Sequence, residues 1–121
     1  MEKEIEELAR ELGLDKNDKN FRKALSADKI LAWVGDAVIK LHLSEEISKL
    51  NITRKDMNNK REEIEKNDNL KKICPDNWKG LISDGKKQNH ATLFEAIIGA
   101  VFLAKGYNKT KQMLMDYLPI T

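Results

Sequence analysis

The amino-acid sequence predicts an all-α fold, and three features of the chain point that way. Aromatic residues make up only 6% of it and charged residues 35%, which favours amphipathic helices over sheets rich in aromatic and β-branched side chains. Apolar residues recur at helical spacing in several segments. Capping residues and glycines stand where those segments begin or end. With 121 residues, 40% of them hydrophobic, we expect 1–121 to form one domain around one core.

The N-terminal half is expected to form three helices. An apolar stripe predicts a helix over residues 2–12, with Gly13 as its C-terminal stop. A short helix is expected around residues 21–25. Ser26 is then expected to cap a long central helix, whose apolar stripe continues to Leu50.

The C-terminal half is expected to add further helices. Thr53 and Asp56 match an acidic variant of the capping box, and the mostly charged sequence after them predicts a helix with most of its surface exposed. Residues 75–90 read as a short helix followed by a loop. Residues 91–107 are apolar almost all round and predict a buried helix that ends at Gly106. Thr110 is expected to cap the last helix.

Charge and cysteine content narrow the function classes. The chain has 22 basic and 20 acidic residues, a net charge of +2, which is too small for indiscriminate binding of polyanions. Any nucleic-acid site must therefore be local. The single Cys74 cannot form an intramolecular disulfide and is expected to be a small buried residue. No apolar run approaches the length of a membrane span, so we expect a soluble cytoplasmic protein without a membrane partner.

Two carboxylates stand where the helical pattern calls for apolar residues: Asp36 in ILAWVGDAVI and Glu95 in ATLFEAIIGAVF. A buried carboxylate must be paired, hydrogen-bonded or bound to a metal. Gly35 and Gly99 would let the two helices approach closely. One interpretation is a shared Mg²⁺ site for phosphoryl transfer. The other, equally weighted, is that each acid caps a neighbouring helix or lies at the edge of the bundle, and spacing alone does not decide.

Together, the segments WVGDAVIKLHLSEEI and TLFEAIIGAVFLAKGY resemble the two acidic motifs of the ribonuclease III catalytic domain. The resemblance covers most of the chain, and two motifs in the family's order are more specific than either alone. It implies a homodimeric helical bundle that binds double-stranded RNA and hydrolyses its phosphodiesters to 5′-phosphate and 3′-hydroxyl ends. By this resemblance, Asp36 and Glu95 hold the catalytic Mg²⁺, for which Mn²⁺ is an expected substitute.

The chain departs from the family pattern at three positions. Lys29 and Ala32 stand where the family usually has glutamates, and Thr92 stands where it usually has an aspartate. Thr92 is therefore expected to lie behind the metal ligands rather than to bind the metal. A similar loss of acids is found in the mini-ribonuclease III branch, which lacks the double-stranded-RNA-binding domain. The resemblance thus favours a compact, stand-alone relative of that branch.

Five further residues have candidate roles. Trp33 matches the position of an aromatic that inserts into the partner subunit in the family, with a core tryptophan as the alternative. The candidates for contacting RNA phosphates are Lys60, Arg61, Lys86 and Lys87. Such a modest set suffices for recognition by helical shape and 2′-hydroxyls. Charge runs are also common on solvated surfaces, so the alternative for each is a plain surface residue.

Two other functions remain open at this point. The first is a catalytically weak or inactive ribonuclease III fold that serves as an RNA-binding scaffold, which the residues at 29, 32 and 92 make credible. The second is a helical protein-interaction domain without an RNA role, which would agree with the near-neutral net charge.

Overall fold

The computed structural model describes residues 1–81, 90–118 and 120, and in these residues the chain is helical with no strand. The expected all-α fold is confirmed. The helices, in chain order, are α1 (Glu2–Leu12), α2 (Lys19–Ala24), α3 (Lys29–Ser48), α4 (Arg54–Glu65), α5 (Asn67–Ile73), α6 (Asp76–Lys79), α7 (His90–Lys105) and α8 (Tyr107–Tyr117). None of the helices described is long and apolar enough to cross a membrane.

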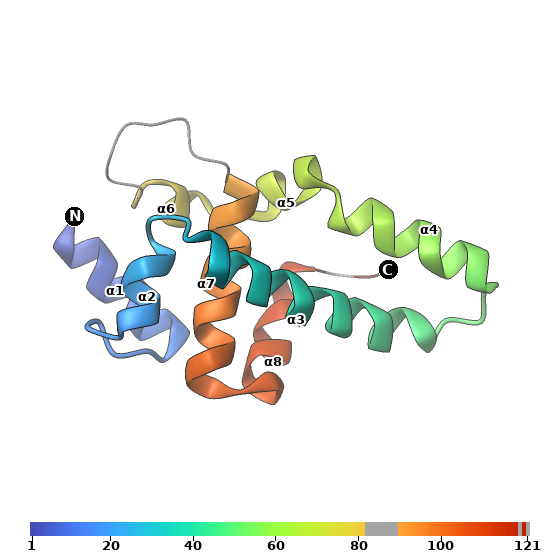
Figure 1. Cartoon of the computed structure of the whole chain (residues 1–121), viewed down its shortest axis with the longest axis horizontal. Coiled ribbons are helices and arrows are strands. Elements are labelled where there is room, and N and C mark those ends of the chain that lie inside the picture. The colour runs from blue at the N-terminus through green and yellow to red at the C-terminus, as the bar shows by residue number, and fades with distance from the viewer. Residues whose placement is uncertain (82–89, 119, 121) are drawn as a thin grey trace.

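The centre of the fold is the crossing of α3 and α7 (Figure 1). Nine of the 16 residues of α7 are buried, which confirms the buried helix expected over residues 91–107. The other helices are arranged around this helix: α2 and α5 pack against it, and α8 folds back along it. The all-round apolar sequence over most of α7 follows from this position, because several elements pack around the helix, whereas its last turn is exposed.

An aromatic cluster joins the last helices to the core. The ring of Trp78 on α6 stacks on Phe94 of α7 at 5.7 Å between centroids and meets Tyr117 of α8 edge to face at 5.4 Å. Such pairs add about 0.5–1.5 kcal/mol beyond the burial of their area. Cys74, close to Trp78 in the sequence, is buried as expected, and this burial raises the pKa of its thiol to about 11.

Two expected helix boundaries are correct. Gly13 ends α1 in the left-handed conformation, with φ 69°. Thr53 caps α4, since its Oγ1 accepts a hydrogen bond from the Asp56 N–H at 3.1 Å. No residue of α4 is buried, which agrees with the exposed helix expected there.

Ser26 is not the cap of α3, and that expectation was wrong. The cap is Asp28, whose Oδ2 accepts a hydrogen bond from the Leu31 N–H at 2.9 Å. Ala27, between the two, has φ 56°, a left-handed conformation that a right-handed helix cannot include. The helix therefore begins after Ala27, where the positive end of the helix dipole also stabilises the negative Asp28 carboxylate.

Thr110 does not cap the last helix either. α8 begins at Tyr107, directly after Gly106 with φ 84°, and Thr110 is fully buried one turn inside it. Its hydroxyl donates to the Gly106 carbonyl oxygen at 2.8 Å. The left-handed turn at Gly106 lets the chain reverse immediately after α7, so no polar connector is needed.

Candidate active site

The α3–α7 crossing is a backbone-to-backbone contact made possible by two glycines. A Cβ atom built on Gly35 would fall far inside 3.0 Å of the Glu95 carbonyl oxygen, and one built on Gly99 would fall far inside 3.0 Å of the Leu31 carbonyl oxygen. Real Cβ atoms do not approach other atoms so closely. The close approach expected from Gly35 and Gly99 is thus observed, and it places Asp36, next to Gly35, against α7.

The carboxyl groups of Asp36 and Glu95 meet at this crossing. Burial, then a hydrogen bond with the Asp36 carboxyl, then the charge of Asp36 raise the pKa of Glu95 to about 7. Two carboxyls that hydrogen-bond must share a proton or bind a cation, because two bare negative charges repel. The structure therefore brings the two acids together, as a shared cation site requires, rather than leaving them as separate caps.

Lys40 lies beside this carboxyl pair. Its Nζ is 3.1 Å from Asp36 Oδ2, one helical turn further along α3, and its positive charge opposes the rise in the pKa of Glu95. The Lys40 side chain is 52% exposed, so the ion pair contributes little to stability. Sequence reasoning missed Lys40, although its spacing of four residues from Asp36 was a usable signal.

A third carboxylate, Glu65, ends α4 on the same side of the molecule. Burial raises the pKa of Glu65, the charges of Lys40 and Arg61 lower it, and the charge of Asp36 raises it. Its Oε1 atom is buried and has no hydrogen-bond partner in the part of the chain that the structure describes. Sequence reasoning missed Glu65 as well, because it lies in a run of charged residues that reads as solvated surface.

The donor set at the crossing fits a hard, hydrated cation. Among the residues that the structure describes, no three His, Cys, Asp or Glu side chains already lie at metal-binding spacing. The carboxylates of Asp36 and Glu95 nevertheless supply the oxygen ligands that Mg²⁺ prefers, and Mg²⁺ usually keeps several of its waters. The charge of Glu65 interacts with those of both acids, and its unpartnered oxygen is a further acceptor.

Two of the three departures from the family pattern lie beside the carboxyl pair. Ala32 is buried on α3, one turn before Asp36, and Thr92 is half-buried on α7, three residues before Glu95. Lys29 is exposed at the first residue of α3. The positions of Ala32 and Thr92 agree with a location beside the site, whereas Lys29 lies nearly two turns from Asp36 along the helix.

The structure describes two of the four candidate RNA-binding residues. A guanidinium nitrogen of Arg61 donates to Ser44 Oγ at 3.0 Å, so Arg61 ties α4 to α3 in this conformation. Lys60 is half-buried and lines a pocket between α4, α5 and the end of the chain. Lys86 and Lys87 lie outside the described residues.

Trp33 lies on the surface of α3, where its side chain is 75% exposed. The alternative of a core tryptophan is therefore wrong. Around it is an apolar groove of about 480 Å³, lined by Trp33, Val34, Ala37, Val38, Leu41, Phe102 and Tyr107. Ile30, 73% exposed, adds to the apolar surface of the same helix. A contiguous apolar surface of this kind is typical of an interaction site.

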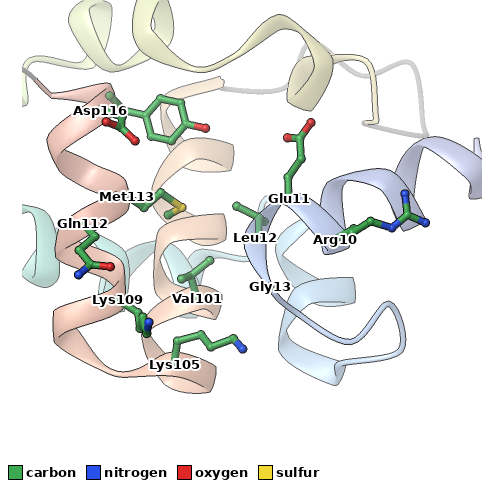
Figure 2. A pocket seen from close by; sticks show the side chains of 11 residues that line it. Arg10, Glu11, Leu12, Gly13, Val101, Lys105, Lys109, Gln112, Met113 and Asp116 are labelled. Atoms are coloured by element: carbon green, nitrogen blue, oxygen red, sulfur yellow. The ribbon is translucent and has the colours of Figure 1, made fainter.

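A second cavity of about 480 Å³ lies between α1, the end of α7 and α8 (Figure 2). Its charged lining residues carry both signs, with Lys105 and Lys109 toward one end and Glu11 and Asp116 toward the other (Figure 2). None of the sequence-predicted site residues lines it. The candidate active site is therefore the α3–α7 crossing and not this cavity.

Comparison with known proteins returns one family. The family model described as "Ribonuclease III domain" matches residues 29–106, which include α3 through α7 and hence both acids at the crossing. No curated protein and no solved structure matches the chain significantly.

Proposed function

This chain belongs to the ribonuclease III domain family, and from that premise we propose that it is a Mg²⁺-dependent endoribonuclease that cuts double-stranded RNA. Its products would carry 5′-phosphate and 3′-hydroxyl ends. The observation that supports this best is the glycine-mediated crossing, which sets the Asp36 and Glu95 carboxyls against each other on two buried helices. A rigid pair of oxygen donors is what a catalytic magnesium needs from the protein.

In this proposal Asp36 and Glu95 hold the cation. Bound Mg²⁺ would supply an activated water and neutralise charge on the scissile phosphate. Asp36, with 37% of its side chain exposed, faces the solvent from which RNA arrives. To bind the cation as a carboxylate, Glu95 would lose to the solvent the proton that it shares with Asp36. Lys40, now paired with Asp36, releases it, which its exposed and flexible side chain can do at little cost.

We also propose that the protein acts as a homodimer through the apolar groove around Trp33. An aromatic side chain that is largely exposed in one subunit and set beside a groove without charged residues is a typical interface anchor. Two subunits would then present two sites to one RNA duplex, one for each strand. Lys60, Arg61, Lys86 and Lys87 remain the candidates for contacting its phosphates, and Thr92 for supporting the metal ligands.

The test is cleavage of labelled duplex RNA by the variants Asp36→Asn and Glu95→Gln in the presence of Mg²⁺ or Mn²⁺. Each variant removes a charged metal ligand with almost no change of volume, so we expect cleavage to fall at least about 100-fold while circular dichroism and duplex binding persist. Glu7→Gln, an exposed acid on α1, is the matched control and should cleave normally. Near-normal cleavage by either site variant would show that the assignment is wrong.

The same assay separates the RNA-binding scaffold from the enzyme. The Lys40–Asp36 ion pair and the loss of acids at 32 and 92 favour that alternative. A scaffold would bind duplex RNA with strong dependence on salt and leave it intact. A protein-interaction domain would neither bind nor cut it.

A further inference from the structure

The path of α4 carries Glu65 back to the candidate active site. α4 follows α3 after a short connection and runs back along it, and α5 then continues beside α7 (Figure 1). Glu65 is the last residue of α4. Its charge interacts with those of Lys40 and Asp36 on α3, and it also acts on Glu95 of α7. Three helices therefore each contribute one carboxylate to the same region.

One oxygen of the half-buried Glu65 carboxylate is left without a partner. Its Oε1 atom is buried and accepts no hydrogen bond from residues 1–81, 90–118 or 120. A buried carboxylate oxygen without a donor costs free energy that surface glutamates avoid, so such groups are rare unless a bound cation or water satisfies them. Lys40 and Arg61 act on Glu65 only through their charge, while Lys40 is paired with Asp36 and Arg61 with Ser44.

The neighbouring helices lack acids that a metal site would use. Ala32 contributes no oxygen, and Thr92 offers only a hydroxyl. A site with two protein carboxylates attracts Mg²⁺ less strongly than one with more, because each anionic group adds Coulombic attraction. An additional carboxylate on α4 would restore part of that attraction from a different element of the fold.

We infer that Glu65 supplies the third anionic group of the metal site and takes the place of carboxylates that positions 32 and 92 do not provide. This inference rests on the proposed function. Glu65 would act on the hydrated cation through one of its waters, since the described residues hold no three acidic, histidine or cysteine side chains that could bind a metal directly. In the cation-free protein, Lys40 partly balances the charges of Asp36 and Glu65.

The test measures metal binding directly and without RNA. Mn²⁺ is titrated into wild-type protein and the variants Glu65→Gln, Glu63→Gln and Asp36→Asn, and free Mn²⁺ is followed by electron paramagnetic resonance. Glu63 is the matched control, because it is an exposed glutamate on the same helix and its loss changes the net charge equally. We expect Glu65→Gln to raise the Mn²⁺ dissociation constant about tenfold, the scale for losing a group that supports the metal's ligands. Glu63→Gln should change it less than about twofold, given screening of exposed charges.

Glu65→Gln should stay folded with an unchanged or higher melting temperature, because it replaces a half-buried carboxylate, one oxygen of which is buried without a partner, by a neutral amide. If Asp36→Asn weakens Mn²⁺ binding but Glu65→Gln behaves like Glu63→Gln, the inference is overturned while the metal site of the proposed function stands. If Asp36→Asn leaves Mn²⁺ binding unchanged, the proposed metal site itself is wrong, and the role of Glu65 falls with it.

Discussion

Replacing Gly35 by alanine should separate the two halves of the active site. The new Cβ would press into the Glu95 carbonyl group, and the Gly99 backbone nitrogen would lie only 3.0 Å from it. These are backbone atoms of a buried helix, so they cannot rotate away as a side chain would. α3 and α7 must instead move apart by about 1 Å, a displacement that can cost catalysis about 100-fold when it shifts reacting groups.

The cost in stability follows from two opposing effects. Overpacking a tight core costs about 1–3 kcal/mol, and a clash with rigid backbone belongs at the upper end. Alanine regains about 1 kcal/mol over glycine as a helix former. A net loss of about 2 kcal/mol should lower the melting temperature by about 8 °C in a domain of this size. Because Asp36 and Glu95 are no longer held together, Gly35→Ala should also cleave RNA far more slowly.

Gly80→Ala is the matched control for this substitution. Gly80 has φ −69°, which alanine adopts readily, and a Cβ built there would meet nothing closer than 3.8 Å. The melting temperature of Gly80→Ala should therefore equal or slightly exceed that of wild type. Thermal denaturation followed by circular dichroism compares the two variants. If Gly35→Ala melts within about 2 °C of Gly80→Ala, the reasoning from the crossing is wrong.

Two further predictions concern α3. Trp33→Ala should weaken the proposed dimer by about 2 kcal/mol or more, which is about 30-fold in the dissociation constant. Leu103 is exposed but lies outside the groove, so Leu103→Ala is the control and should leave the dimer intact. Equal association of the two variants in sedimentation at low micromolar concentration would contradict the proposed interface. His42 is fully buried, and neither of its ring nitrogens has a hydrogen-bond partner among the described residues. Burial lowers the pKa of His42; the charge of Glu46 opposes this lowering, and the charge of Lys111 adds to it. The unfolded chain therefore binds a proton more readily than the folded one, so stability should fall as pH drops below about 6.5, by no more than about 1.4 kcal/mol per pH unit from this group. The free energy of unfolding, measured by urea denaturation, should depend less on pH in His42→Leu than in wild type. The same pH dependence in both proteins would contradict the role given to His42.

The central crossing was predictable because its signals are local and unusual. A glycine beside an acid in one apolar helix, and an acid four residues before a glycine in another, each break the expected pattern. Burial costs require such exceptions to be compensated, and the simplest compensation is that the two helices meet at these residues. The structure shows that meeting at Gly35 and Gly99.

Glu65 was not predictable from its surroundings. It follows Glu62 and Glu63 in a helix without buried residues, and what distinguishes it is the turn at Lys66, with φ −55° and ψ 139°, where α4 ends and α5 begins. Glu65 thus ends α4 where the chain turns into α5, which packs against α7, and this tertiary position cannot be read from the run of charged residues around it. The prediction that Ser26 caps α3 was wrong for a local reason instead. Ala27 has a left-handed conformation, so the helix begins after it and Asp28 is the cap.

The groove around Trp33 has one more consequence, which concerns ionic strength. Its lining residues carry no charged side chain, so subunit association through it would gain little from Coulombic attraction and lose little to screening. Contacts between lysines and RNA phosphates behave in the opposite way, since added salt competes directly with them. In the dimeric enzyme that we propose, rising salt would therefore release the RNA while the two subunits stay together, and the protein would return to the next duplex already paired.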